Sequence, residues 1–301
     1  MKPSRIKTVI IICGPTAVGK TAVAIALAKY FKTEIISADS RQCYKELDIG
    51  VARPTQEELK NVPHHFVASH SINENINAAF FEKYALQKVN ELFQIHNVLI
   101  MVGGTGLYIK AFCEGLDEIP AIDESIRKKI TEEYAVKGLQ WLQDEIEKRD
   151  PIFFAEGEIQ NPQRVMRALE VVEATGKSIL FFRKNKKAQR DFEIIKIGID
   201  LPKEALHWNI NARVDKMLSD GLVEEVRTLA LYKNLNALQT VGYTEIFDYL
   251  EGKLTLAQAA EEIKKNTRQY AKRQLTWFTR DKDTRWFAPT ALNEMIEYLK
   301  V

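Results

Sequence analysis

The chain has 301 residues and carries 43 Lys and Arg against 41 Asp and Glu, so its formal net charge is +2. This balance excludes a histone-like polycation and an acidic tail protein, and any surface that binds nucleic acid must be local. With 46% hydrophobic and 28% charged residues, the composition is that of a packed protein rather than a disordered one. The length allows two domains.

Cysteine usage and the short apolar segments indicate a cytoplasmic protein. Cys13, Cys43 and Cys113 are an odd number without C-x-x-C spacing, which argues against a disulfide framework or a zinc module. The apolar run 9–13 is too short for a secretory signal, and no stretch reaches the roughly 20 apolar residues of a membrane helix. We therefore expect a cytoplasmic chain that does not contact a membrane.

The first third of the chain predicts strands that alternate with helices. In chain order these are strand 9–13, helix 20–30, strand 34–37, helix 80–93 and strand 97–102. The first strand is a β-branched run typical of burial on both faces, and the first helix has no internal Pro or Gly. Ligands in such sheets bind beyond the carboxyl ends of the strands, so we expect a site near residues 14–21, Asp39 and residues 103–105.

A phosphate-binding octet follows the first strand. It consists of Gly14, Pro15, Thr16, Ala17, Val18, Gly19, Lys20 and Thr21, and it matches G-x-x-x-x-G-K-[ST] between a strand and a helix. The glycines let backbone N–H groups point at a phosphate, Lys20 neutralises phosphate oxygens and Thr21 can coordinate Mg²⁺. An ordinary glycine turn is the alternative. The octet predicts a polyphosphate ligand, which can be ATP, GTP or another diphosphate ester.

The best candidate for a catalytic carboxylate is Asp39. A standard nucleoside triphosphatase has an apolar strand that ends in an Asp near Mg²⁺, but here the strand 97–102 ends in glycines. Asp200 could imitate that residue, although Leu201 and Pro202 continue its segment. Asp39 follows the second strand and can face the octet. Its alternative role is that of a turn or helix-capping residue.

The rest of the chain is mainly helical. After Gly115 successive amphipathic helices are expected from residue 123 to about residue 190. The run 197–199 could be a strand that returns to the first sheet, and helices are expected from Glu204 to the end. The sequence therefore predicts an α/β fold, with a P-loop-type parallel sheet flanked by helices and a helical insertion domain. The expected domains are a core of residues 1–118 and 192–301 and an insertion of residues 119–191.

Two stretches combine basic side chains with aromatic or polar ones. Basic side chains can bind phosphates, and aromatic rings can stack on bases or pack inward. A solvated charged face is the alternative for each stretch, and a core position is favoured for Trp277 and Phe278. The residues concerned are Arg183, Lys184, Lys186, Lys187 and Arg190, and near the C-terminus Lys264, Lys265, Arg268, Tyr270, Lys272, Arg273, Trp277, Phe278 and Arg280.

Two further segments are candidates for substrate contact. Residues 163–167 are Gln-Arg-Val-Met-Arg at an expected helix start after Pro162, where Gln and Arg suit base edges and phosphates. His64 and His65 follow Pro63 in an expected loop, with no third ligand at the spacing of a metal site. Substrate contact and simple surface exposure both remain open for this pair.

Taken together and in order, these motifs resemble the tRNA dimethylallyltransferase family, also called tRNA isopentenyltransferases, in its bacterial form. The resemblance covers nearly the whole chain. Its motifs are GPTAVGKT from Gly14, ISADSRQCY from Ile36, DIGVARP from Asp48, PHH from Pro63, VGGTGLY from Val102, NPQRVMRALEV from Asn161, RVDKMLSDGL from Arg213, VGYTEI from Val241 and TRQYAKRQLTWF from Thr267.

The resemblance implies transfer of a dimethylallyl group from dimethylallyl diphosphate to the exocyclic N6 of the adenosine 3′ of the anticodon in tRNA, with Mg²⁺. It implies that the octet holds diphosphate as the leaving group rather than a nucleotide, and that Lys20, Thr16 and Thr21 stabilise the developing charge. Thr21 would be the protein ligand of Mg²⁺. Arg213 would complete the diphosphate site, and Asp39 would accept a proton from N6.

The resemblance also implies a set of residues that bind the anticodon stem-loop. The target base normally stacks in the loop, so it must be extruded to reach the site. The implied tRNA-binding residues are Asp39, Ser40, Arg41, Gln42, Thr105, Arg127, Gln163, Arg164, Val165, Met166, Arg167, Gly242 and Tyr243. We expect the enzyme to be a monomer.

The chain departs from the family pattern at three places. Ala68 stands where the family has an acidic residue after the His pair, Asn209 stands where an Arg is common, and Gln160-Asn161 replaces an N-D pair. Loss of a cation can weaken diphosphate binding. Two other classes of protein remain alternatives. The octet alone also allows a P-loop kinase or nucleoside triphosphatase, and Asn209 and Ala68 suggest an RNA-binding protein without catalysis.

Overall fold

A computed structural model describes residues 7–184 and 186–300 of the chain. The chain divides into two compact units, Met1–Cys113 with Gln189–Val301 and Glu114–Ala188. The sequence placed the two boundaries at 118/119 and 191/192, a few residues further along the chain.

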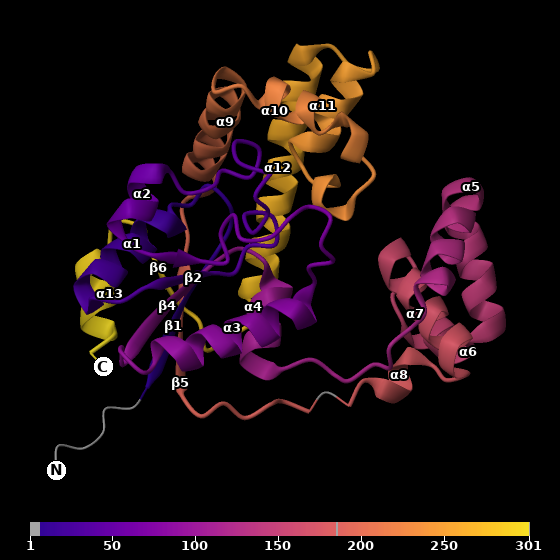
Figure 1. Cartoon of the computed structure of the whole chain (residues 1–301), viewed down its shortest axis with the longest axis horizontal. Helices are drawn as coiled ribbons and strands as arrows, with labels where there is room; N and C mark the ends of the chain where they lie inside the picture. Colours follow the sequence, from indigo (N-terminus) through magenta and orange to yellow (C-terminus); the bar gives the residue numbers. More distant parts are fainter. Residues whose placement is uncertain (1–6, 185, 301) are drawn as a thin grey trace. The chain divides into compact units, whose positions relative to one another are not determined.

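The first unit is built on a six-stranded sheet in which every neighbouring pair of strands is parallel (Figure 1). The strands are β1 (Thr8–Cys13), β2 (Ile35–Ser37), β3 (His64–His65), β4 (Val98–Val102), β5 (Glu193–Ile199) and β6 (Arg285–Phe287), in the order β3-β2-β4-β1-β5-β6. β1 lies between β4 and β5 and is buried along its whole length, as its β-branched sequence predicts. The predicted strands 9–13, 34–37 and 97–102 and the returning strand at 197–199 are confirmed.

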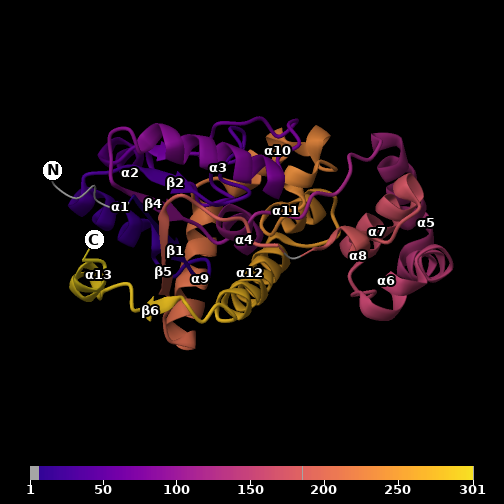
Figure 2. The same ribbon diagram turned by 90° about the horizontal axis from the view of Figure 1, so that it is seen from below.

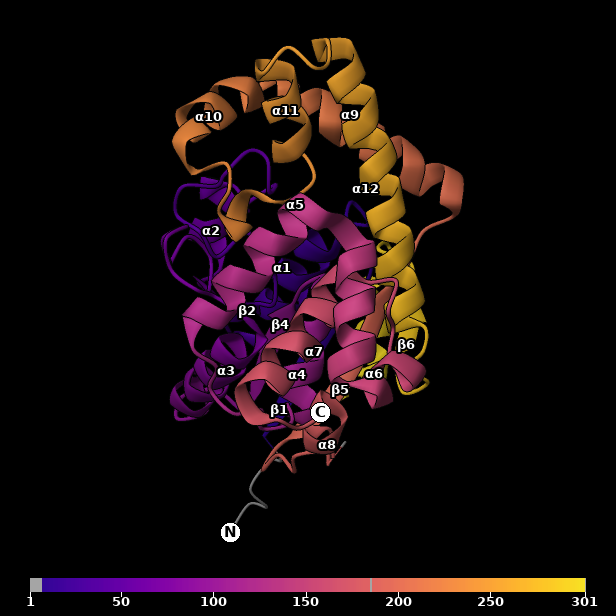
Figure 3. The same ribbon diagram turned by 90° about the vertical axis from the view of Figure 1, so that its right-hand side faces the viewer.

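Helices cover both faces of this sheet. Successive residues of β1 belong to different apolar clusters, since Ile11 lies in one cluster with Phe81 of α3 and Ile10 in the other with Leu27 of α1. α9 and α12 lie side by side (Figures 2 and 3). The helices of the unit are α1 (Lys20–Phe31), α2 (Gln56–Asn61), α3 (Ala78–Leu92), α4 (Gly106–Glu114), α9 (Lys203–Ser219), α10 (Leu222–Thr228), α11 (Tyr243–Leu250), α12 (Leu256–Phe278) and α13 (Leu292–Tyr298).

Two strands of the sheet were not predicted. The C-terminal segment is not helical throughout, because β6 interrupts it and pairs with β5. A Cβ on Gly198 of β5 would lie 2.5 Å from the Trp286 ring, so the glycine makes room for the edge strand. His64 and His65 form the short strand β3 rather than a loop, with His64 in register with Ile35 of β2. In both cases pairing with a distant segment decides the local structure.

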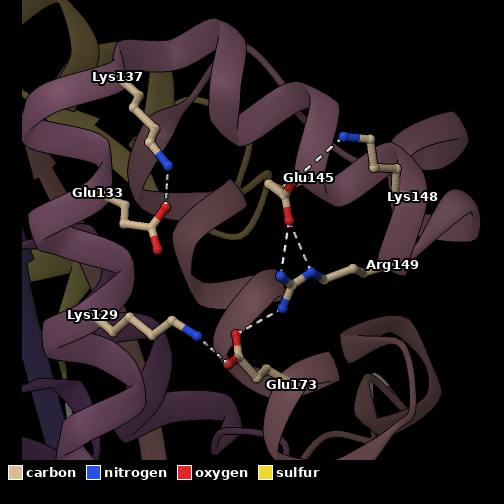
Figure 4. A network of polar contacts seen from close by, with 7 residues as sticks. All are labelled: Lys129, Glu133, Lys137, Glu145, Lys148, Arg149 and Glu173. Atoms are coloured by element: carbon tan, nitrogen blue, oxygen red, sulfur yellow. Dashed lines mark hydrogen bonds and ion pairs between the residues drawn. The ribbon is translucent and has the colours of Figure 1, made fainter.

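The second unit is helical, with α5 (Glu124–Arg149), α6 (Pro151–Glu156), α7 (Pro162–Thr175) and α8 (Ile179–Phe182). α5 is broken at Gly138, whose φ is 74°. Ion pairs join α5 to α7, where Glu173 lies between Lys129 and Arg149 (Figure 4). Helix was expected to about residue 190 but ends at Phe182. Within the described part of the chain, no helix combines the length and apolar character needed to cross a membrane.

Candidate active site

The loop between β1 and α1 has the backbone of a phosphate cradle. Gly14 and Gly19 have φ of 142° and 96°, and Ala17 has a left-handed φ of 64°. A Cβ on Gly14 would lie 2.4 Å from the carbonyl oxygen of Ile199, so this position requires glycine. Gly19 caps α1 without a side-chain hydrogen bond. The first N–H groups of α1 are therefore available to an anion, which the helix dipole also favours.

Lys20 lies in this loop, where its side chain can bind an anion. Its Nζ donates a hydrogen bond to the carbonyl of Pro15 at 2.6 Å. Desolvation of the ammonium group and, next, the positive charge of Arg213 lower the pKa of Lys20 to about 8, while Asp39 acts in the opposite direction. A diphosphate beside this group would favour its charged form.

Two residues of α9, one turn apart, hold the same loop. Arg213 Nη1 donates to Thr16 Oγ1 at 3.1 Å, and Asn209 Nδ2 donates to the carbonyl of Ala17 at 3.0 Å. Arg213 is therefore placed beside the loop as expected. Asn209, which departs from the family pattern, has a definite role here, because it holds the loop backbone instead of adding a cation.

Asp39 follows β2 and makes a turn. Its Oδ1 accepts hydrogen bonds from the N–H groups of Arg41 (2.8 Å) and Gln42 (3.2 Å). Thr105, after β4, supports the same turn, since its Oγ1 accepts the N–H of Ser40 at 3.0 Å and lies 3.3 Å from Ser40 Oγ. The turn role and the catalytic role of Asp39 are compatible, because the turn uses only one of its two oxygens.

Gln42 does not present its amide to a base in this structure. Gln42 Nε2 donates to the carbonyls of Val51 (3.2 Å) and Ala52 (3.0 Å). Its amide N–H groups therefore donate to the backbone of the 48–53 loop. Glu225 holds the other end of that loop, because its carboxylate accepts the N–H groups of Ile49 (2.7 Å) and Gly50 (3.0 Å).

Two cavities of the first unit meet at these residues. The loop cavity, of about 300 Å³, is lined by Lys20 and Thr21 from the octet, and the helix cavity, of about 570 Å³, by side chains of α11 and α12. The residues that line both are Thr16, Asp39, Val51, Ala52, Arg213 and Tyr270. Burial and then the charge of Asp39 raise the pKa of Tyr270 to about 12, so it is a neutral hydrogen-bonding group. Asp39 thus lies where a group in one cavity can meet a group in the other.

The C-terminal basic stretch is divided between this site and the surface. Arg273 lines the helix cavity beside Tyr270, whereas Lys264 pairs with Asp215. Phe278 is buried, as favoured. Trp277 is 36% exposed and is not a core residue; its ring packs against Gly106, where a Cβ would collide with it.

The residues of the insertion expected to bind tRNA differ in accessibility. Arg127 and Arg167 both pair with Glu170, which is 3% exposed, at 3.7 and 2.8 Å. The side chains of Val165 and Met166 are buried in the core of this unit, so tRNA contact through them does not fit the structure. Among the expected residues of α7, Gln163 and Arg164 are exposed and Arg167 is partly exposed.

Three other expected positions have structural roles. Tyr243 is fully buried and its hydroxyl donates to Glu225 Oε1 at 2.5 Å, so direct tRNA contact by this side chain does not fit either. Gly242, with φ of 98°, begins α11 and lines the helix cavity. Arg190 is tied to the carbonyl of Phe112 (2.8 Å) and to Glu82 (2.8 Å), which is the structural alternative for a basic residue.

The histidine pair is neither freely exposed nor a metal site. His65 Nε2 lies 2.6 Å from Glu34 Oε2, and both histidines are half-buried. His64 lines the loop cavity, and its burial lowers its pKa. No group of three His, Cys, Asp or Glu side chains within residues 7–184 and 186–300 could hold a metal ion.

Comparison with known proteins gives one consistent match. The family model described as IPP transferase matches residues 42–281. The tRNA dimethylallyltransferase of Cytophaga hutchinsonii is 46% identical over 98% of this chain and 97% of its own, and that of Flavobacterium johnsoniae is 47% identical over 97% of each.

Solved structures agree with this match. The tRNA isopentenylpyrophosphate transferase of Bacillus halodurans superposes with a TM-score of 0.71 at 35% identity, covering 97% of this chain and 95% of that one. A eukaryotic dimethylallyltransferase acting on tRNA gives a TM-score of 0.76 at 27% identity, covering 96% of this chain and 75% of that one.

Proposed function

This chain belongs to the IPP transferase family, the tRNA-modifying prenyltransferases, and we propose that it transfers a dimethylallyl group from dimethylallyl diphosphate to N6 of the adenosine 3′ of the tRNA anticodon. The observation that carries the proposal is the position of Asp39 and Thr16, which line both the loop cavity and the helix cavity. The donor would bind on the octet side, and the adenine would enter on the α11 and α12 side.

The loop cavity supplies the groups that a leaving diphosphate needs. When the C–O bond of the donor breaks, the electron pair remains on the diphosphate. Lys20, Arg213 and the Thr16 hydroxyl, together with the N-terminus of α1, lie where they would stabilise that charge. Donors fixed in advance around a developing charge are worth about 10²–10³ in rate each.

Asp39 would receive the proton that N6 loses. As the N6 lone pair forms the new C–N bond, N6 becomes positively charged and must release a proton. Asp39 Oδ1 is occupied by the N–H groups of Arg41 and Gln42, which hold the carboxylate in place. Oδ2 is then the oxygen that would accept the proton.

The donor set of the loop cavity fits Mg²⁺ bound largely through the substrate. Mg²⁺ keeps several waters and takes one or two protein oxygens together with substrate phosphates. Thr21 lines the loop cavity directly after Lys20 and would supply such an oxygen. When bound, the ion would neutralise charge on the diphosphate.

Each unit has its own candidate contacts for the anticodon arm. Gln163, Arg164 and Arg167 lie at the surface at the start of α7, and Arg41 and Arg273 line the helix cavity. Arginine contacts with phosphates supply affinity that depends on salt. The adenine would have to leave its stack to reach Asp39. We further propose that the enzyme acts as a monomer.

The test is transfer of radiolabel from dimethylallyl diphosphate to unmodified tRNA with Mg²⁺. The wild type and the surface variant Lys300→Ala should transfer label, and Lys20→Ala should lose it by about 10²-fold or more. Phosphate release from ATP without tRNA would favour a P-loop nucleoside triphosphatase instead. Binding of the anticodon stem-loop without any label transfer would favour an RNA-binding protein that has lost catalysis.

A further inference from the structure

We propose that Gln274 of α12 is a positioning residue of the donor site, which it sets by fixing the backbone of Thr16 in the phosphate loop. The inference rests on the proposed function, because it concerns the cavity assigned to the diphosphate. Gln274 is 6% exposed, makes two hydrogen bonds to backbone, and its side chain also interacts with the Tyr270 hydroxyl one turn earlier on α12. Its Oε1 accepts the N–H of Thr16 at 2.8 Å, and its Nε2 donates to the carbonyl of Gly104 at 2.9 Å.

The two bonds fix the orientation of the amide. The Thr16 N–H can only donate and the Gly104 carbonyl can only accept, so Gln274 must point its oxygen to one and its nitrogen to the other. A Cβ on Gly104 would lie 2.2 Å from Gln274 Nε2, so the amide fits only because this position is glycine. The side chain thus connects the loop after β1 to the loop after β4.

Packing alone does not account for a glutamine here. Its neighbours on the same face of α12 are the buried Ala271 and Phe278, where an aliphatic side chain would also fill space. A buried amide is costly unless its polar atoms are paired, and both ends of Gln274 are paired with the backbone of the loop cavity. The amide of Gln274 therefore fixes the backbone of the phosphate loop rather than only filling space.

Thr16 is the residue on which this geometry depends. Arg213 from α9 holds its hydroxyl, and Gln274 from α12 holds its backbone N–H. Thr16, Gly104 and Gln274 all line the loop cavity. One turn earlier on α12, Tyr270 lines both cavities, so one helix contributes to the walls of the donor and the acceptor sides.

The experiment compares two substitutions in the full-length protein. Gln274→Met keeps the length of the side chain and removes the two hydrogen bonds to backbone together with the contact to the Tyr270 hydroxyl. Gln274→Glu keeps the acceptor for Thr16 but loses the donor to Gly104 and adds a negative charge beside the diphosphate. The exposed Thr276→Ala on the same helix is the control. The probe is inorganic diphosphate with Mg²⁺, titrated by calorimetry, followed by steady-state kinetics with dimethylallyl diphosphate and tRNA.

We expect Gln274→Met to raise the Kd of diphosphate and the KM of the donor about tenfold or more, with KM for tRNA changed by less than about threefold. Gln274→Glu should weaken diphosphate binding further. A general loss of folding would instead lower the active fraction, and with it the maximal rate, without changing either KM value. If Gln274→Met does not fold, Gln274→Leu, which also removes the hydrogen bonds and adds no charge, decides between the same two outcomes.

Two results separate this inference from the function on which it rests. If the wild type fails to bind diphosphate, the assignment of the loop cavity is wrong. If the wild type binds it and Gln274→Met binds it equally well, the assignment stands and the role of Gln274 is refuted, whatever the charged variant Gln274→Glu does.

Discussion

The phosphate loop and the helices of the insertion hold their polar side chains in different ways. In the loop, Asn209 and Gln274 bind backbone atoms directly, and both of these side chains are at least partly buried. In the insertion, surface arginines pair with carboxylates, as Arg149 does with Glu173 (Figure 4). Catalysis at a single bond requires that the groups around it are held in fixed positions. Binding to the phosphates of an RNA tolerates side chains that change conformation.

The largest effect on label transfer is expected from substitution of Asp39, which belongs to the fixed site of the first unit. Asp39→Asn retains an oxygen that can accept the N–H groups of Arg41 and Gln42, so the turn should persist. The amide cannot accept the proton from N6. Label transfer should therefore fall by about 10²–10⁴-fold, while tRNA affinity measured by filter binding stays close to that of the wild type.

Asp39→Ala is the matched variant, because it removes the turn acceptor as well. It should transfer label no better than Asp39→Asn and should also be less stable to heat. Full turnover by Asp39→Asn would remove this carboxylate from the mechanism and leave only its role in the turn.

The next effect is a pH dependence that arises from Lys20. Its pKa in the free protein is lowered to about 8, so the ammonium group is charged below that pH and neutral above it. A bound diphosphate favours the charged form, so binding above pH 8 takes up a proton and the affinity falls, by up to about tenfold per pH unit. Calorimetry at pH 9 in buffers of different ionisation enthalpy measures this uptake.

Lys20→Arg is the reference for that titration. Arginine stays charged over the whole range, so the variant shows only the titration of diphosphate itself. Equal proton uptake by the wild type and Lys20→Arg would show that Lys20 is already charged at pH 9 in the free protein.

The sequence predicted the loop because the signal lies in adjacent residues. A strand, the octet and a helix follow one another, and Asp39 stands directly after the next strand. Gln274 was missed since its partner Thr16 is 258 residues away, and no local pattern connects them. Glu225, whose partners lie 175 to 177 residues away, was missed for the same reason.

Inside motifs, sequence reasoning went wrong where it ignored helical periodicity. The family resemblance implies tRNA contact by Val165 and Met166, which stand in the same motif as Arg164 and Arg167. On a helix these two apolar side chains turn to the same buried face as Leu169, and the core of the second unit contains all three. The spacing of apolar residues along α7 held this information, whereas the register of β3 and β6 depends on pairing with distant strands.

A moderate effect is expected when the surface arginines of α7 are replaced. Arg164→Ala and Arg167→Ala should each weaken tRNA binding by a few-fold and lower the slope of log affinity against log salt by about 1, if each contacts one phosphate. Diphosphate affinity should not change. Gln140→Ala, an exposed change on α5, is the control. An unchanged salt slope would remove these arginines from the RNA interface.

The smallest effect is expected in the ion-pair network of Figure 4. Glu173 is bonded to Lys129 at 3.4 Å and to Arg149 at 3.0 Å, and all of these side chains are partly exposed. Solvent screens such pairs, so Glu173→Gln should cost about 1 kcal/mol or less of unfolding free energy, and less still at high salt. Hydrogen exchange of α5 and α7 in the full chain measures it, with label transfer as a second readout. A large loss of exchange protection, or of activity, would show that these pairs fix the insertion as firmly as Asn209 and Gln274 hold the phosphate loop, and the contrast between the two regions would fail.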